Sequence, residues 1–168
     1  MSLMRRRQSG ASLDELRDAY ERRLAEFRRV AAAIVGDREL ASDVVQEAFV
    51  RAVAQRASFA GRGSLDGWLW RIVVNTARDH RAPPLSGRDE AGDRGVDDDD
   101  ADDRRGVVRA AVQQLPERQR LVLFLRHYAD LDYGSIAAAL SISDGTVAAT
   151  LHAAHARLRE LLSEVPSP

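Results

Sequence analysis

The chain has 168 residues, of which 45% are hydrophobic and 30% are charged, and its formal net charge is −1. This length suits one domain or two small helical units and is too short for a large enzyme. The absence of cysteine excludes disulfides and thiolate metal sites, and no apolar run approaches the roughly 18 residues of a membrane span. We therefore expect a soluble, cytoplasmic protein that does not insert into a membrane.

The near-neutral net charge conceals an uneven distribution. Residues 83–106 carry four arginines against nine acidic residues, whereas residues 12–82 carry twelve against eleven and residues 107–168 carry six against six. Neither flanking segment is strongly basic, as the domain of a simple DNA-binding protein would be. The acidity is concentrated in the middle of the chain.

The first predicted helix follows a capping box. Ser12 and Glu15 have the spacing at which each side chain bonds the other residue's backbone N–H. Apolar residues then recur at helical spacing as far as Gly36, a glycine that can end the helix. This pattern predicts one long helix packed along a single face.

The second predicted helix has an apolar face and a polar face. Asp37 is a suitable N-cap, and a broad apolar arc follows it. The arc consists of Ala41, Val44, Val45, Ala48, Phe49, Ala52 and Val53. The opposite face carries Asp43, Gln46, Glu47 and Arg51, with Val50 among them. An apolar residue ringed by polar ones suggests a partner surface, although a solvated face with one exposed valine is the simpler alternative.

A glycine-containing loop separates this helix from the third. Gly61 and Gly63 permit backbone conformations that other residues rarely adopt. Leu65, Trp68, Leu69, Ile72 and Ala77 then mark an apolar stripe. Trp68 shares this stripe and is predicted in the core, whereas for Trp70 the core and a base-stacking surface are both open.

Residues 83–106 have little apolar content and no periodicity, which predicts a disordered acidic linker. Its run from Asp97 to Asp100 serves solubility, or else it mimics nucleic acid and covers the protein's own DNA-binding surfaces. A second helical unit follows from Val107. Pro116 suits the first turn of a helix to about His127, Asp132 can cap another, and residues 141–145 form a tight turn before the last helix.

A helix, a short turn and a second helix are the pattern of the helix-turn-helix motif. The fold class is therefore predicted as all-α, with two small helical domains, residues 12–82 and 107–163. They are joined by the disordered acidic linker at residues 83–106, and the second contains the helix-turn-helix. No nucleophile paired with a base and no phosphate-binding loop is evident, so an enzyme, a cofactor and a metal site are not expected.

Several motifs together resemble the sigma-70 family of bacterial sigma factors, in its extracytoplasmic-function class. Asp43-Val-Val-Gln-Glu-Ala-Phe49 resembles the helix with which these proteins bind core RNA polymerase. Phe59-x-Gly-x-Gly-Ser-Leu-x-x-Trp-Leu-x-x-Ile-x-x-Asn75-Thr-Ala resembles the segment that opens and recognises the −10 promoter element. Three further motifs resemble the domain that recognises the −35 element. They are Leu-Pro-x-x-x-Arg120, Asp132-Tyr-x-x-Ile-Ala-x-x-Leu140 and Gly145-Thr-Val-x-x-x-Leu-His152.

The resemblance implies the function of an alternative sigma factor with two sets of binding residues. Its partners would be core RNA polymerase, promoter DNA and an anti-sigma factor. The implied polymerase-binding residues are Asp43, Gln46, Glu47 and Val50. The implied DNA-binding residues are Arg62, Gly63, Ser64, Arg71, Asn75, Arg78, Thr146, Thr150, His152, His155 and Arg157, and Arg81 is a further candidate for a phosphate contact.

The last helix departs from the family pattern. Ala148 and Ala153 lie on its outward face, with Thr150 on the flank, where the family commonly has Lys or Arg. Side chains of this kind cannot reach base edges as arginine does. Recognition of the −35 element is then weak and dependent on DNA shape, or the domain binds proteins. An alternative function is a sigma-like decoy that binds an anti-sigma factor without productive −35 binding.

Overall fold

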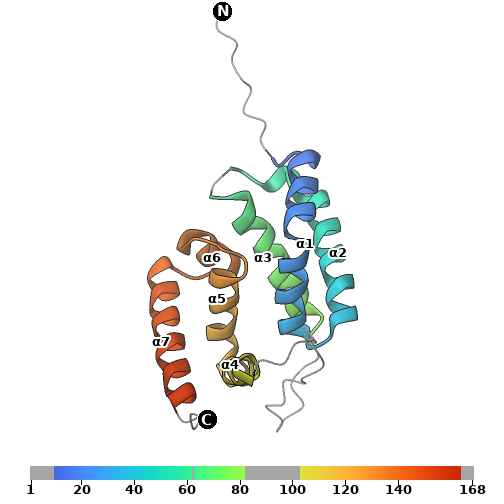
Figure 1. Ribbon diagram of the computed structural model, residues 1–168. Coiled ribbons are helices and arrows are strands. Elements are labelled where there is room, and N and C mark those ends of the chain that lie inside the picture. The colour runs from blue at the N-terminus through green and yellow to red at the C-terminus, as the bar shows by residue number, and fades with distance from the viewer. Residues whose placement is uncertain (1–9, 62, 82–102, 164–168) are drawn as a thin grey trace, which may run out of the picture.

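The computed structural model describes residues 10–61, 63–81 and 103–163, and in this part of the chain all regular structure is helical (Figure 1). The predicted all-α fold class is confirmed. The helices are α1 (Leu13–Val35), α2 (Arg38–Gln55), the 3-10 turn η1 (Arg56–Ser58), α3 (Leu65–Asp79), α4 (Asp103–Gln113), α5 (Glu117–His127), α6 (Tyr133–Leu140) and α7 (Asp144–Ser163). Helices α1–α3 form one bundle, and α5–α7 with α4 form the other.

The ends of the first two helices lie where the capping signals predict them. The Ser12 hydroxyl accepts from the Glu15 backbone N–H, while the Glu15 carboxylate accepts from that of Ser12 at 2.8 Å. Gly36 ends α1 in the left-handed conformation at φ 77°. The Asp37 carboxylate accepts from the Leu40 N–H at 2.9 Å and so caps α2. Local hydrogen-bonding rules therefore explain how α1 turns into α2.

An aromatic cluster forms the centre of the first bundle. Phe27 and Trp70 are both fully buried, with ring centroids 4.5 Å apart, and Phe49 packs edge-on against Phe27 at 5.3 Å. The sequence predicted Trp68 in the core and left Trp70 open between the core and a base-stacking surface, but the structure buries Trp70 more deeply than Trp68. Trp70 is the wholly buried one, whereas Trp68 is only partly buried and packs against Phe59. Helix α3 contacts α1, α2 and α6. More of its circumference is therefore buried than the apolar stripe seen in the sequence.

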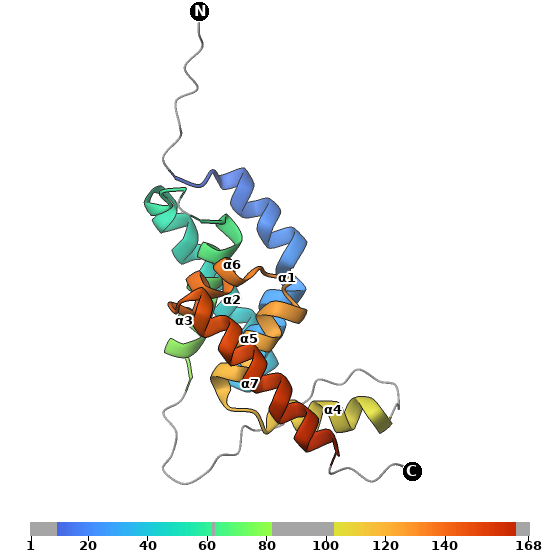
Figure 2. The same ribbon diagram turned by 90° about the vertical axis from the view of Figure 1, so that its left-hand side faces the viewer.

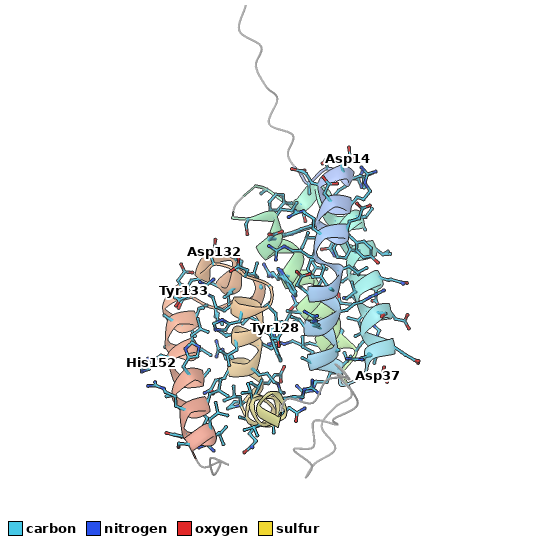
Figure 3. The ribbon with its side chains drawn as sticks, in the orientation of Figure 1. Asp14, Asp37, Tyr128, Asp132, Tyr133 and His152 are labelled. Carbon is cyan, nitrogen blue, oxygen red and sulfur yellow. The ribbon has the colours of Figure 1, made fainter. Side chains whose placement is uncertain are left out.

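The second bundle contains the predicted helix-turn-helix. The Asp132 carboxylate accepts from the Ser135 N–H at 2.7 Å and caps α6, and Ser141 ends α6 in the left-handed conformation at φ 56°. Helices α6 and α7 then meet at 97°, within the range of this motif. Figure 3 labels Asp37 and Asp132 at the starts of their helices. Within the described residues, no single helix is long and apolar enough to cross a membrane.

The C-terminal boundary of the predicted linker differs from the structure. Helix α4 begins at Asp103, so residues 103–106 are helical rather than part of a disordered segment. Further along α4, Ala111 is buried in the second bundle. Residues 82–102, including the run from Asp97 to Asp100, lie outside the described residues.

The two bundles lie directly against each other. Helix α6 packs on α3, and the region around α5 approaches α1, as the two perpendicular views show (Figure 2). Most buried apolar residues of both bundles belong to one cluster. Two domains that the sequence separates by composition are therefore in contact in this structure.

Candidate functional site

Helix α2 presents the expected polar face to solvent. Asp43 and Gln46 are exposed, and Val50 has 69% of its surface accessible. Val53, one turn further along, is also exposed, at 38%, although the apolar arc predicted it inside. The exposed face of α2 is thus more apolar toward its C-terminal end than the sequence pattern indicates.

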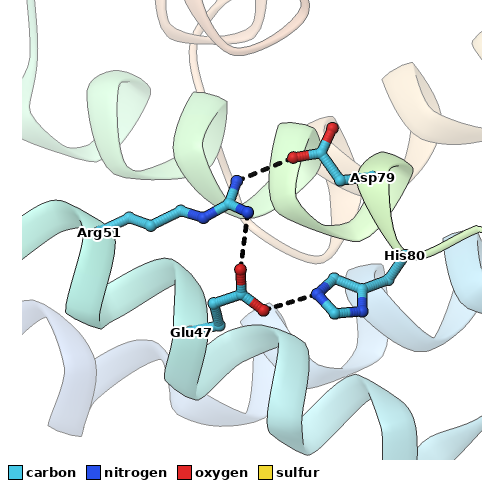
Figure 4. A network of polar contacts seen from close by, with 4 residues as sticks. All are labelled: Glu47, Arg51, Asp79 and His80. Carbon is cyan, nitrogen blue, oxygen red and sulfur yellow. Dashed lines mark hydrogen bonds and ion pairs between the residues drawn. The ribbon is translucent and has the colours of Figure 1, made fainter.

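Glu47 is not free on that face, because it belongs to a network that joins α2 to the end of α3 (Figure 4). Its two carboxylate oxygens lie 2.6 Å from a guanidinium nitrogen of Arg51 and 2.6 Å from Nε2 of His80. Arg51 also donates to Asp79 at 2.8 Å. The hydrogen bond with His80, and after it the contact with Arg51, hold the pKa of the Glu47 carboxyl below its usual value.

This network was only partly accessible to sequence reasoning. Arg51 follows Glu47 by four residues, which is the spacing of a helical ion pair. Asp79 and His80 come from the far end of another helix, and no local pattern connects them with Glu47. The structure thus holds the side chain of Glu47 in place and leaves Asp43, Gln46 and Val50 open to a partner.

The loop before α3 has the backbone that its glycines predict. Gly61 and Gly63 adopt φ values of 68° and 81°, which disfavour any residue with a side chain. The Ser64 hydroxyl accepts from the Gly67 N–H at 3.0 Å and caps α3. Arg62 lies outside the described residues. The predicted DNA-binding residues Gly63 and Ser64 therefore direct the chain into α3.

Helix α3 displays its candidate DNA-binding residues along one face. Arg71, Asn75 and Arg78 follow one another at intervals of four and three residues and are exposed. Asn75 offers a donor and an acceptor to a base edge. Nε of Arg78 lies 3.7 Å from a carboxylate oxygen of Glu117 in the second bundle, so one candidate phosphate contact has an internal partner.

The candidate hydroxyl groups of α7 are used within the helix itself. The Thr150 hydroxyl donates to the Thr146 carbonyl at 2.7 Å, and the Thr146 hydroxyl is hydrogen-bonded to that of Ser143 at 2.8 Å. Ala148 and Ala153 are exposed, as the sequence predicts for this face. The Thr150 hydroxyl proton is therefore already used within α7, and the Thr146 hydroxyl shares a hydrogen bond with Ser143.

The remaining α7 candidates lie further toward its C-terminus. His152 is exposed and labelled on the outer side of α7 in Figure 3. The ring of His155 lies 5.7 Å, centroid to centroid, from that of His127 on α5, and Arg157 pairs with Glu160 at 3.0 Å. The guanidinium of Arg157 is therefore paired within α7 and is less available to a DNA phosphate.

A shallow groove between the start of α5 and the first turns of α7 adds residues that sequence reasoning missed. Arg118 and Gln119 of α5 line it together with Thr146, Ala149 and Ala153 of α7. Arg118 is exposed, and its guanidinium brings a cation to the alanine face from a different helix. Only the packing of α5 beside α7 brings these residues together.

Comparison with known proteins gives the family of both bundles. Residues 16–82 match the model of sigma-70 region 2, and residues 105–158 match that of sigma-70 region 4. The RNA polymerase sigma-H factor of Pseudomonas aeruginosa is 32% identical over 152 residues, covering 80% of this chain and 77% of that protein. The ECF RNA polymerase sigma-E factor of Escherichia coli K12 is 32% identical over 144 residues, with 75% and 73% covered.

Two solved structures share the fold. CnrH in complex with the cytosolic domain of CnrY superposes with a TM-score of 0.69 at 22% identity, covering 93% of this chain and 92% of that one. The sigma factor RpoE in complex with the anti-sigma factor NepR, from Bartonella quintana, gives 0.66 at 19% identity, with 92% and 100% covered.

The matched relatives are named as sigma factors, and nothing in the comparisons favours the decoy hypothesis over the sigma-factor interpretation. The region 2 match covers the bundle that carries the candidate surfaces of α2 and α3, and the region 4 match covers the helix-turn-helix. The chain therefore belongs to the sigma-70 family of RNA polymerase sigma factors, in its extracytoplasmic-function class.

Proposed function

We propose that this sigma factor acts in the cytoplasm by binding core RNA polymerase through α2 and by melting and recognising the −10 element through α3 and the loop before it. Residues 12–82 would hold both surfaces. Residues 107–163 would recognise the −35 element, and the linker between the two domains would let them reach separate sites. The observation that carries the proposal is that α2 and α3 display two different exposed faces on one helical bundle.

The polymerase surface would consist of Asp43, Gln46 and Val50, with Glu47 at its edge. Exposure of a large apolar side chain among polar ones supports this, because such a residue gains most by being covered. Glu47 would contribute through a carboxylate already fixed by Arg51 and His80, so little side-chain freedom remains to be lost on binding.

The promoter surface would consist of residues 62–64 with Arg71, Asn75 and Arg78. A base flipped from the melting duplex would meet the Asn75 amide, while the arginines would contact phosphates. In the second domain, Thr146, Thr150, His152, His155 and Arg157 would approach the −35 element. Support for tight binding is weaker there, because several of these groups have internal partners.

An anti-sigma factor is a further proposed partner. The two solved relatives are complexes with the cytosolic domain of CnrY and with NepR. This chain shares their fold over more than nine-tenths of its length. An inhibitor that covers exposed surfaces of both domains would explain how such a protein is kept inactive.

The polymerase surface is tested by Val50→Glu. The substitution places a charge where an apolar contact is proposed, and affinity for core polymerase should fall at least about tenfold, equal to about 1.4 kcal/mol. The free energy of unfolding should change by less than about 0.5 kcal/mol, because the side chain is exposed. Ala25→Glu, at an exposed position of α1, is the matched control and should bind as wild type does. Unchanged polymerase affinity of folded Val50→Glu would refute the docking assignment.

The promoter surface is tested by Asn75→Ala. Loss of a base-edge contact should reduce open-complex formation about tenfold, within the roughly 1–3 kcal/mol of a good base contact. Binding to core polymerase should not change. Gln55→Ala removes another exposed amide from the same bundle and serves as the control. Normal promoter melting by the Asn75 variant would remove this residue from the site.

A further inference from the structure

His80 holds a fixed position at the end of α3, beside α2. It is the C-cap of the helix, and its backbone N–H donates to the carbonyl of the buried Thr76 at 3.2 Å. The imidazole extends from there toward Glu47, and its Nε2 lies 2.6 Å from a carboxylate oxygen (Figure 4). In the part of the chain that the structure describes, this is the one polar contact of the His80 side chain. The contact therefore depends on the packing of α3 against α2.

The two oxygens of the Glu47 carboxylate are held from two different helices. Arg51 binds one oxygen from within α2, and His80 binds the other from α3. A pair at four-residue spacing within one helix is weak and lets both long side chains move together. The contact from the second helix fixes the direction of the carboxylate. Since each oxygen can accept more than one hydrogen bond, the group is held without being saturated.

The held carboxylate lies in the middle of the surface proposed to bind polymerase. Asp43 precedes Glu47 by one helical turn and Val50 follows it by three residues, so the three are neighbours on α2. The Glu47 side chain keeps 39% of its surface accessible. The nearby cation, Arg51, is already shared between Glu47 and Asp79. The charges beside Val50 are thus acidic, and they fit a partner that presents a cationic side chain.

The contact between His80 and Glu47 is not what holds the bundle together. The centre of the bundle is formed by Phe27 and Trp70, which are fully buried. The side chains of His80 and Glu47 are 35% and 39% accessible, and polar pairs as exposed as this one contribute little to folding. A role in binding therefore accounts for the convergence of two helices on one accessible carboxylate.

We propose that His80 is a positioning residue for polymerase binding, which holds the Glu47 carboxylate in the orientation that a cationic group of the polymerase meets. The identity of the partner rests on the proposed function, whereas the role of His80 rests on the geometry. A carboxylate that is already held loses less rotamer freedom when it binds. The freedom of one such side chain corresponds to roughly a threefold to tenfold change in affinity.

The test compares two substitutions of His80 by the equilibrium affinity of the full chain for purified core polymerase. His80→Ala removes the contact and should weaken binding roughly threefold to tenfold. His80→Gln keeps an uncharged N–H donor at a similar distance from the backbone and should bind within about twofold of wild type. His127→Ala, which removes an exposed histidine from α5, is the matched control and should bind as wild type does. Wild-type affinity of His80→Ala, or an equal loss in His80→Gln, would overturn the proposal.

A double-mutant cycle separates positioning from a general structural effect. Glu47→Ala should weaken polymerase binding by itself, and adding His80→Ala should then change the affinity by less than about twofold, because the imidazole has no carboxylate left to hold. Asp79→Asn weakens the ion pair with Arg51 but leaves both contacts of Glu47, so its affinity should stay close to that of wild type. The positioning role would be overturned by a full further loss from His80→Ala in the Glu47→Ala background, or by an equal loss in Asp79→Asn.

Folding and the proposed function are checked separately from the role of His80. Urea unfolding followed by circular dichroism should show that every variant is folded under the binding conditions, since none of the changed side chains is buried. Unchanged polymerase affinity of both Glu47→Ala and Val50→Glu would refute the proposed polymerase surface itself. A loss of affinity in those two variants without a loss in His80→Ala would overturn the role of His80 alone.

Discussion

Asp132 is the residue whose contribution to stability can be predicted most directly. Its carboxylate accepts from the Ser135 backbone N–H at 2.7 Å at the start of α6. Asp132→Ala should lower the free energy of unfolding by about 1 kcal/mol, as loss of an N-cap typically does. Urea unfolding of the full chain, followed by circular dichroism, measures this change. No loss of stability would mean that Asp132 does not cap α6 in solution.

The same residue predicts a pH dependence. The hydrogen bond from the Ser135 backbone, and after it that from the Ser135 side chain, lower the pKa of the Asp132 carboxyl. A lowered pKa in the folded state gives stability that is present above the unfolded value, near 3.9, and is lost as pH falls through the lower folded value. Asp132→Asn keeps an acceptor but cannot titrate, so its stability should fall less steeply than wild type below about pH 4.

Single residues differ in how far the sequence predicts their surroundings. The caps Ser12, Asp37 and Asp132 were predictable, because each bonds a backbone group three residues away. The hydrogen bond between Glu47 and His80 was not predictable, since 33 residues separate them along the chain. The full burial of Trp70 was likewise beyond a helical pattern, because it depends on helices that contact α3 from several sides.

The proposed contact of helix α7 with DNA is tested by adding cations to its exposed face. Its exposed alanines can be replaced without disturbing the core, whereas replacing Thr150 costs its hydrogen bond to the Thr146 carbonyl. In the variant Ala148→Lys, Thr150→Arg and Ala153→Arg, each new phosphate contact should steepen the slope of log affinity against log salt by about 0.9. Titration of a duplex at several salt concentrations measures that slope.

A charge-matched control separates position from net charge. Leu13→Arg, Ala25→Arg and Val108→Arg add three cations at exposed positions on helices other than α7. This control should leave the slope nearly unchanged. An equal slope for the two triple variants would show that α7 does not face DNA, and the second domain would then bind proteins instead.

At the scale of elements, the sequence predicted the order and type of the helices well. Apolar periodicity and capping residues lie in the sequence itself, so α1, α2, α3 and the helix-turn-helix were predictable. The start of α4 was placed too late, because the charged residues from Asp103 resemble a linker until packing of Ala111 is known. The groove that joins Arg118 to Ala149 could not be predicted, since it arises only when α5 and α7 pack together.

The whole molecule combines two separately predictable domains with an arrangement that no sequence pattern indicates. Gly67 and Ser135 are not part of an apolar pattern in the sequence, and they can approach closely because both residues are small. The pairing of Arg81 with Glu117 likewise joins two helices through residues that look solvated in the sequence. Contacts of this kind leave no apolar periodicity in the sequence, because they form between small or charged residues that are far apart in the chain.

The central claim is that this chain directs core RNA polymerase to start transcription at particular promoters. The most direct measurement is run-off transcription on fragmented genomic DNA of the encoding organism, with its purified core polymerase, with and without the protein. Sequencing of the 5′ ends should find transcripts that depend on the protein, start at a limited set of sites and share an upstream −10 sequence. Val50→Glu should yield fewer of these transcripts than wild type at a limiting concentration of the protein, as expected from its lower affinity for core polymerase. An identical set of transcripts with and without the wild-type protein would contradict the account.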